Sequence, residues 1–412
     1  MKHGYLSQYF DGVAIKRLSV VEADVIHSHQ HEFNGVEGLR TILGEPDGKV
    51  RFDAKFLYLT DQDDEPVVED GFLTWYDARL KARLERGVDR SEYRLYFPTN
   101  LVSQCAAAGD LLVIAKRADS TLLAIVAEKD TTIERQILWL FGFSDLTHPG
   151  FSVKSELETE QDRIGFAARV VLEQIGIEAE EQAPNYLEQM LSNFKGAFPK
   201  TIEFSAYARS TIPDMSSYDD PDAALVAWME REEILFRTLE KHLLGEKLRG
   251  LTQAGIEDTE PFIQLMQSAL QRRKSRAGSA LENHLEQVFK DQGVTYTRTG
   301  VTENKLKPDF IFPSIQNYHD VAFPQTRLTM LASKSTCKDR WRQILNEAAR
   351  IPDKHLLTLE PSISENQTDE MKTERVQLVI PQSLHATYST KQQTWLMDMA
   401  SFTDLARQRQ LV

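Results

Sequence analysis

The chain has 412 residues, of which 48 are Lys or Arg and 62 are Asp or Glu, so its formal net charge is −14. This length predicts two or three domains, and a composition of 41% hydrophobic and 27% charged residues excludes a disordered polyelectrolyte and a low-complexity chain. Cys105 and Cys337 form no CxxC pair, and no apolar run approaches the roughly 18 residues of a membrane-spanning helix; we therefore expect a protein of the reducing cytoplasm, without a disulfide framework, a cysteine-rich zinc site or a membrane partner.

The first 150 residues have the patterns of strands and turns. Residues 50–59 partly alternate between apolar and polar side chains, and residues 93–97 are aromatic and rich in strand formers. Two apolar runs, residues 110–115 and 122–127, flank an Ala-Asp-Ser turn and predict a hairpin. We therefore predict a mainly β domain over residues 1–150.

The pattern becomes helical from Gln161. Apolar residues recur at steps of three and four up to Ile175, and residues 210–221, rich in Pro, Ser and Asp, have the composition of a linker. We therefore predict a helical region and linker over residues 151–222, followed by a further domain over residues 223–412.

The last domain alternates between helical and strand patterns. Helices are predicted at residues 223–244, 260–270, 278–291 and 339–350, and strands at residues 309–312, 328–333 and 376–380. A short mixed sheet flanked by helices is the most economical arrangement of these elements. The predicted fold class is therefore α+β, with a mainly β N-terminal domain and an α/β C-terminal core.

Charge is distributed unevenly along the chain. Residues 272–350 contain 14 Lys or Arg and 8 Asp or Glu, a local balance of +6, whereas the other residues together carry −20. A basic block in an acidic chain fits a confined phosphate-binding surface, because counterion release depends on the charges at the contact. A solvated basic face is the alternative interpretation.

An aspartate and a lysine stand at the ends of two predicted strands. Asp309 opens the first strand and Lys334 ends the next strong one, so both side chains can meet at one end of neighbouring strands. Carboxylates bind Mg²⁺, and an ammonium group near the attacking water stabilises developing phosphate charge, as phosphodiester hydrolysis requires. In the commonest arrangement of such nuclease sites a second acid lies two residues before the lysine, but that position is Ala332.

Glu347 offers a replacement for that acid. In an α-helix over residues 339–350, Arg340 and Glu347 lie about 20° apart around the axis, so they share a face. Packing of the adjacent apolar stripe against the sheet would bring Glu347 towards Lys334. Lys338, Asp339 and Arg340 would then project from the first turn, where they could read C·G pairs in the major groove.

A basic cluster precedes another acid. Arg273, Lys274 and Arg276 lie directly before the helix predicted from residue 278, and Glu282 stands on its first turns. The cluster could contact DNA phosphates and Glu282 could supply an outer carboxylate to the metal site. A capped helix with a solvated basic lead explains the same residues.

Several of these stretches resemble one known family. The matching stretches are Arg273-Lys274-Ser275-Arg276-Ala277-Gly278, Lys307-Pro308-Asp309-Phe310, Tyr318-His319-Asp320 and, above all, the run from Lys334 to Ala348, KSTCKDRWRQILNEA. They resemble the catalytic domain of the EcoRII restriction endonuclease family. Shorter stretches, Ile15-Lys16-Arg17-Leu18-Ser19, His29-Gln30 and Arg90-Ser91-Glu92-Tyr93-Arg94, resemble its N-terminal DNA-binding pseudobarrel.

The resemblance implies a Mg²⁺-dependent homodimeric type II endonuclease with a restriction-endonuclease-like core. Such an enzyme cuts double-stranded DNA at a CCWGG-like site, where W is A or T. On this pattern Asp309, Lys334 and Glu347 are catalytic, Asp309 and Glu347 hold the metal, and Glu282 is an additional acid near it. Tyr318 matches a residue linked to the active site of the family, and a packed aromatic residue beside the cleft is an equal alternative.

The resemblance also implies DNA contacts and partners. Lys338, Asp339 and Arg340 fall where related enzymes read the outer C·G pairs. The N-terminal domain would be an effector module that binds a second copy of the site and restrains the catalytic dimer until it is occupied. Its implied contact residues are Arg17, Arg90, Glu92 and Arg94. A cognate cytosine methyltransferase is expected in the same system, but not as a stable subunit.

Two hypotheses follow from the sequence. The first is a sequence-specific Mg²⁺-dependent DNA endonuclease, and the second is a DNA-binding protein built on an inactive nuclease core. The retained Asp, Lys and Glu favour the endonuclease, because a protein that only binds DNA has no use for a buried pair of metal-seeking carboxylates.

Overall fold

The computed structural model describes residues 2, 4–62, 65–87, 89–143, 146, 148–179, 183–253 and 259–411, apart from the side chains of residues 26, 184, 253, 338 and 339. The chain divides into two compact units. Unit 1 comprises Met1–Glu178 and Ser362–Asn366, and unit 2 comprises Ala179–Pro361 and Gln367–Val412. The division falls at Glu178, inside the predicted helical region and linker.

Unit 1 is built around a mixed sheet with the strand order β2-β5-β4-β3-β7-β6-β1-β8. Its strands are β1 (Phe10–Arg17), β2 (Glu32–Asn34), β3 (Val50–Leu59), β4 (Val67–Asp77), β5 (Tyr93–Tyr96), β6 (Leu111–Arg117), β7 (Leu122–Ala127) and β8 (Ser152–Lys154). β3 and β7 are parallel and the other neighbours are antiparallel. The predicted hairpin is confirmed, since β6 and β7 pair antiparallel across a turn in which Ser120 has φ +67°.

Unit 1 also contains short helices. They are α1 (Val20–Ala23), α2 (Val25–Ser28), α3 (Glu37–Leu43), α4 (Leu80–Arg86), α5 (Leu101–Cys105), α6 (Thr132–Phe141) and α7 (Phe166–Gln174). Trp75 is fully buried, stacks on Tyr93 at 5.1 Å between ring centroids, and donates its Nε1–H to the carbonyl of Gly44. The predicted mainly β N-terminal part is therefore confirmed, and the helical pattern after Gln161 corresponds to α7.

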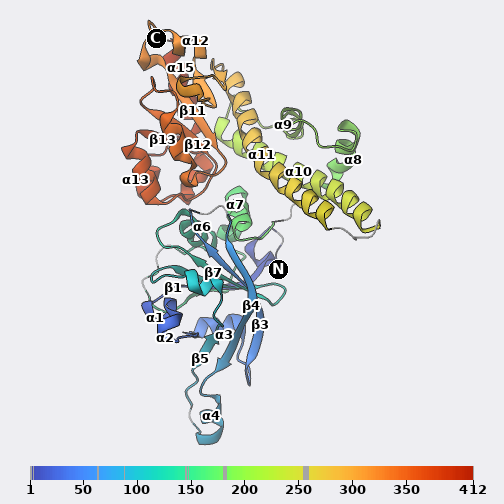
Figure 1. Ribbon diagram of the computed structural model, residues 1–412, viewed down its shortest axis with the longest axis vertical. Helices are drawn as coiled ribbons and strands as arrows, with labels where there is room; N and C mark the ends of the chain where they lie inside the picture. Colours follow the sequence, from blue (N-terminus) through green and yellow to red (C-terminus); the bar gives the residue numbers. More distant parts are fainter. Residues whose placement is uncertain are drawn as a thin grey trace. The chain divides into compact units, whose positions relative to one another are not determined.

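Unit 2 begins with a helical layer. Its helices are α8 (Pro184–Asn193), α9 (Thr201–Ser210), α10 (Pro221–Gln253) and α11 (Glu260–Asp291). α10 and α11 run side by side (Figure 1). Arg276 contacts Glu232 and Glu233, and Arg273 contacts Glu240, so the two helices are antiparallel. Residues 210–221, predicted as a linker, form the turn between α9 and α10 within this unit.

The prediction of two separate helices at residues 260–270 and 278–291 was wrong. α11 is continuous from Glu260 to Asp291, so the basic cluster lies inside the helix and does not lead into it. The residues between the two predicted segments are mostly good helix formers, and a single Gly278 costs only about 1 kcal/mol in a helix interior. The ion pairs with α10 hold this part of α11 in place.

The sheet of unit 2, which is the second of the two described sheets, has the order β13-β12-β11-β10-β9. Its strands are β9 (Thr297–Arg298), β10 (Phe310–Phe312), β11 (Thr329–Lys334), β12 (Lys354–Thr358) and β13 (Val376–Val379). β10 is antiparallel to β9 and β11, whereas β11, β12 and β13 are parallel. β12 was not predicted from the sequence. It begins with Lys354 and His355, whose charged and polar side chains are not typical of a buried strand, yet the strand is buried along its whole length.

Helices pack on this sheet. The remaining ones are α12 (Ile315–His319), α13 (Glu365–Thr373), α14 (Thr390–Gln393) and α15 (Met399–Leu411). Phe289 of α11 and Phe402 of α15 both contact Phe312 of β10, so these two helices cover the same face. The predicted α+β class, with a mixed sheet flanked by helices, is confirmed. Among the described helices, none combines the length and the apolar character that crossing a membrane would require.

Candidate active site

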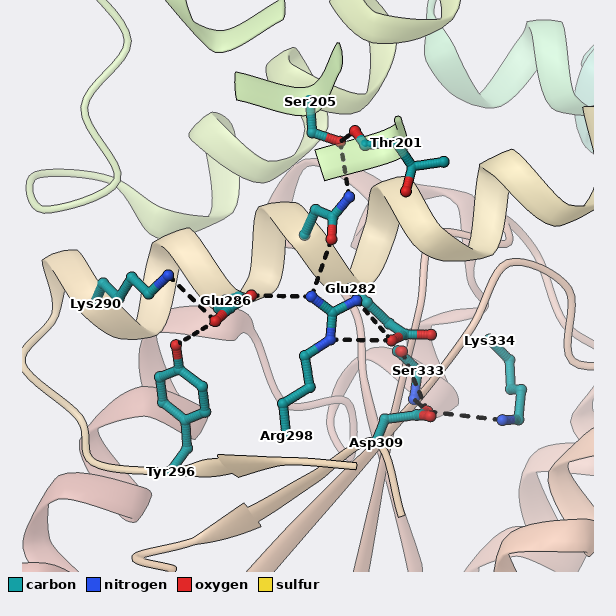
Figure 2. Close-up of polar contacts among 11 residues, drawn as sticks. Thr201, Ser205, Glu282, Glu286, Lys290, Tyr296, Arg298, Asp309, Ser333 and Lys334 are labelled. Atoms are coloured by element: carbon teal, nitrogen blue, oxygen red, sulfur yellow. Dashed lines mark hydrogen bonds and ion pairs between the residues drawn. The ribbon is translucent and has the colours of Figure 1, made fainter. Parts of the chain in front are cut away.

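Asp309 and Lys334 lie beside each other at one edge of the second sheet. β10 and β11 are antiparallel, with Phe310 opposite Leu331, so the residue before β10 and the last residue of β11 meet at the same edge. The Lys334 Nζ is 3.7 Å from Oδ2 of Asp309 (Figure 2). The predicted meeting of the two side chains is confirmed, and their catalytic role stays a prediction.

Ser333 orients the carboxylate of Asp309. Its backbone N–H donates to Oδ2 of Asp309 at 2.7 Å, and its hydroxyl lies 3.3 Å from the same oxygen. Both contacts hold Oδ2 on the side of β11, next to Lys334. The sequence offers no signal for this role of Ser333, because the stronger contact is made by its backbone.

Glu282 lies on α11 close to this pair. Burial raises the pKa of Glu282 above its ordinary value, the negative charge of Asp309 raises it further, and Arg298 opposes the rise. Figure 2 shows the Glu282 carboxylate between Arg298 and the Asp309–Lys334 pair. The structure therefore brings together the outer acid of the sequence prediction and the two strand-end residues.

The helix predicted over residues 339–350 was wrong. The structure has a 3₁₀-helix, η5 (Lys338–Asn346), and Glu347 follows it in an extended conformation with φ −79° and ψ 146°. A 3₁₀-helix has three residues per turn, so side chains three apart lie above one another. Trp341 and Ile344 obey this spacing and are both buried. Arg340 and Glu347 consequently do not share a helical face.

Glu347 nevertheless lies within electrostatic reach of the Asp309–Lys334 pair. Burial raises its pKa above the ordinary value, the ammonium of Lys334 opposes this, and the charge of Asp309 adds to it. The residue is partly buried, and Lys354 donates from Nζ to its backbone carbonyl. The same ammonium donates to the carbonyl of Ile351 at 3.0 Å. Lys354, at the start of the missed strand β12, thus fixes the chain segment that carries Glu347.

The acids of the site suit a hard cation. The charge of Asp309 raises the pKa values of both Glu282 and Glu347, and the ammonium of Lys334 lowers both, so each glutamate lies within electrostatic reach of the Asp309–Lys334 pair. In the described part of the chain, no three His, Cys, Asp or Glu side chains are close enough together to hold a metal ion by themselves. Mg²⁺ does not require this, since it is usually bound by one or two carboxylates, water and substrate phosphate. The residues present therefore fit Mg²⁺.

Tyr318 is a buried residue of α12 with a network of its own. Its hydroxyl donates to both carboxylate oxygens of Glu303 and accepts from the backbone N–H of Arg350 at 3.2 Å. Burial and the bond to Glu303 raise the pKa of Tyr318 to about 12. Glu303 also accepts from the N–H of Ala349, two residues after Glu347. Tyr318 therefore supports the segment that follows Glu347.

The predicted base-reading residues lie in η5. The side chains of Lys338 and Asp339 lie outside the described part of the structure, so the base contacts predicted for them stay predictions. Arg340 is exposed. Cys337, directly before η5, is fully buried and donates its backbone N–H to the buried carboxylate of Glu360, which anchors the start of this segment.

The basic cluster of α11 is divided between two environments. Arg276 is only 6% exposed, forms ion pairs with Glu232 and Glu233, and lies 4.1 Å from the ring centroid of Phe236. Arg273 donates to Glu240 at 2.7 Å, whereas Lys274 is exposed. The two arginines therefore make contacts that join α10 and α11, and the DNA contact predicted for the cluster stays a prediction.

The predicted effector residues lie in unit 1. Arg17 pairs with the buried Glu134 and donates to the carbonyl of Gly109, and Arg90 is exposed. Glu92 and Arg94 form an ion pair with each other. Glu92 also accepts from Arg79 at 2.6 Å. The structure thus brings Glu92 and Arg94 together on and beside β5.

Arg298 lies beside the site and was not predicted from the sequence. It lies on β9 and donates to Glu282 and to Glu286. Tyr296, two residues earlier, donates to Glu286 as well. This alternation of Tyr296 and Arg298 on one side of a strand is the signal that could have identified it.

The comparisons with known proteins concern the part of the chain that carries this site. Residues 236–403 match the family described as EcoRII C terminal, and this range includes Glu282, Asp309, Lys334 and Glu347. The chain is also 41% identical over 225 residues to the type II restriction enzyme EcoRII of Escherichia coli, a match that covers 54% of each chain. The predicted resemblance to EcoRII-type restriction endonucleases is thereby confirmed for the matching part, which spans about half the length of that enzyme.

Solved structures were found as well. Metal-depleted Ecl18kI in complex with uncleaved, modified DNA is 18% identical, with a TM-score of 0.45, and the alignment covers 56% of this chain and 85% of that one. The complex of the restriction endonuclease PspGI with substrate DNA is 16% identical, with a TM-score of 0.43 and coverages of 52% and 93%.

Proposed function

We propose that this chain is a type II restriction endonuclease that hydrolyses double-stranded DNA in a Mg²⁺-dependent and sequence-specific reaction. The observation that carries the proposal is the Asp309–Lys334 pair, flanked by Glu282 and Glu347, inside the region that matches the EcoRII C-terminal family. An ammonium beside a group of carboxylates at a sheet edge is an arrangement suited to phosphodiester hydrolysis.

The positions of the residues support the following roles. Asp309 and Glu347 would hold Mg²⁺, which when bound neutralises charge on the phosphate that is cleaved. Lys334, 3.7 Å from Asp309, would orient the attacking water and stabilise the negative charge that develops on the phosphate. In-line attack by this water leaves a 5′-phosphate and a 3′-hydroxyl. Glu282 would act as an outer acid, and Tyr318 would support the segment after Glu347 through Glu303.

We infer the recognition sequence and the assembly from the resemblance. A CCWGG-like site, a homodimer, and an N-terminal effector module that contacts a second site through Arg17, Arg90, Glu92 and Arg94 complete the proposal. The basic residues Arg273, Lys274 and Arg276 would lie near the DNA backbone; for Arg276 this requires a rearrangement of its ion pairs with α10. The proposed location is the reducing cytoplasm, alongside a cognate cytosine methyltransferase.

Replacing the exposed Arg340 should weaken base discrimination. If Arg340 makes a bidentate contact to guanine, Arg340→Ala should reduce the preference for the cognate site over a site with one substituted outer base pair by about 1–3 kcal/mol. Competition binding with the two DNA sequences measures this difference. Arg342→Ala, which removes an exposed arginine of the same helix that pairs with Glu370, is the matched control. An unchanged preference in R340A would reject the role of Arg340.

A digestion experiment tests the function directly. The purified protein is incubated with DNA that carries one or several CCWGG sites, with Mg²⁺ or with EDTA, and the product ends are sequenced. Mg²⁺-dependent cuts at these sites are expected, and faster cutting of the multi-site DNA would support the effector role. Specific binding without cleavage on either substrate would instead favour a DNA-binding protein on an inactive nuclease core.

A further inference from the structure

The guanidinium of Arg298 lies between the site and the interior of the helical layer. Arg298 belongs to β9, where it is paired with Phe310 of β10, the strand that follows Asp309. Its Nε and NH2 groups both donate to Oε2 of Glu282, at 3.3 and 2.9 Å (Figure 2). Glu282 is thus tied to the same pair of strands that carries Asp309.

The other side of the guanidinium is held just as closely. NH1 of Arg298 donates to Oδ1 of Asn283 and to Oε2 of Glu286, both at 2.9 Å. Asn283 in turn donates to the hydroxyl of Ser205 in α9 at 3.1 Å. The rigid fork of an arginine can satisfy these acceptors simultaneously, whereas a lysine ammonium has neither the planarity nor the span.

The contact leaves one oxygen of Glu282 available. Both Arg298 bonds converge on Oε2, and among the described residues Oε1 of Glu282 accepts no hydrogen bond. The charge of Asp309 acts on this carboxylate, and Figure 2 shows Glu282 on the side of Arg298 that faces Asp309. With Oε2 held by Arg298, the other oxygen of Glu282 points away from the guanidinium, on the side where Asp309 and Lys334 lie.

We propose that Arg298 is a positioning residue of the active centre: by binding Oε2 of Glu282 it presents the second carboxylate oxygen to the cation beside Asp309. This proposal rests on the proposed endonuclease function. It assigns to Arg298 no contact with DNA or with the reacting atoms. Residues that orient a metal ligand in this way typically contribute 10–100-fold to metal affinity or activity.

Substitutions at Arg298 separate geometry from charge. Arg298→Lys keeps the positive charge and loses the fork, so it should raise the Mg²⁺ concentration for half-maximal cleavage by about tenfold or more. It should also lower the Mg²⁺-induced rise in melting temperature of the DNA-free protein, a measurement that does not depend on activity. DNA binding in EDTA should stay unchanged. If R298K melts too low for assay, Arg298→Gln is used instead, and it tests the loss of the fork and of the charge together.

Lys290→Gln is the matched control. Lys290 contacts Glu286 from the exposed side of the same network, at 3.2 Å, without contacting Glu282. K290Q should behave like the wild-type protein in both Mg²⁺ titrations. R298K behaving like K290Q would overturn the proposal.

A double substitution tests whether Arg298 acts through Glu282. In a Glu282→Gln background, Arg298→Lys should add little further loss, because the carboxylate that it positions is already gone. Losses that multiply independently would overturn the proposal, since Arg298 would then act by another route. A wild-type protein that does not cleave DNA with Mg²⁺ would contradict the proposed function. The melting-temperature comparison of R298K with K290Q does not depend on cleavage, so the two failures can be told apart.

Discussion

Lys334→Ala should lower the rate of DNA cleavage by about a thousandfold or more, while specific DNA binding is retained. The ammonium of Lys334 is the cation closest to Asp309 among the contacts described for that carboxylate, at 3.7 Å, and alanine leaves the developing phosphate charge without this stabilisation. Single-turnover cleavage with saturating enzyme measures the chemical step, and a mobility-shift assay in EDTA measures binding. Asp309→Asn should give the same pattern, because it removes the charge that would hold the metal.

The controls for these variants are a lysine and an aspartate of the same unit that lie outside the site. Lys372→Ala and Asp353→Asn remove exposed or partly exposed charges that pair with Asp369 and Arg375 respectively. Both should cleave like the wild-type protein. Full activity in K334A or D309N would refute the assignment of the active centre, and a loss of DNA binding together with cleavage would indicate a folding defect.

Glu347→Gln should reduce cleavage by about a hundredfold at moderate Mg²⁺ concentration, with partial recovery at high Mg²⁺. Glutamine preserves the size of the side chain and leaves the bond from Lys354 to the backbone carbonyl of residue 347 intact. The loss therefore reports the carboxylate charge and not the position of the segment. Cleavage rates measured across a Mg²⁺ titration test this, with Glu374→Gln, an exposed acid after α13, as the control.

The pH dependence gives a second measurement for Glu347. Burial raises its pKa, so in the metal-free protein protonation begins at a higher pH than for an ordinary glutamate. Only the ionised form binds a cation, so the wild-type protein should need more Mg²⁺ as the pH falls through this raised pKa. In E347Q this contribution should be absent. An identical pH dependence in both proteins would contradict a metal-binding role for Glu347.

Local patterns were sufficient to predict the central pair of the site. Asp309 and Lys334 stand at the ends of short apolar runs, and such runs predict strands. If the two strands are neighbours in the sheet, the residues at their ends can lie close together. Asp309 supplies an oxygen ligand and Lys334 supplies a cation, and both properties can be known from the residue types alone. The pairing of β10 with β11 then brings the two side chains together as expected.

The position of Glu347 could be predicted, but for the wrong reason. The α-helical argument placed it on the face of Arg340, whereas the chain forms a 3₁₀-helix that ends before it. Apolar residues at positions 341, 344, 345 and 348 fit both helix types over so short a run. Trp341 and Ile344, three residues apart, are both buried, which the 3₁₀-helix allows. The backbone of Glu347, which follows this helix, is held by a hydrogen bond from the buried ammonium of Lys354.

The amino-acid sequence therefore specifies the strands of both sheets that have clear apolar runs, the acidic and basic residues available for chemistry, and the family resemblance of the C-terminal half. The packed structure decides which charges face the site and which join helices. Arg276 contacts Glu232 across 44 residues of sequence, and Arg298 contacts Glu282 across 16. Contacts at such separations depend on how α10, α11 and β9 pack, and no periodicity within one element encodes them.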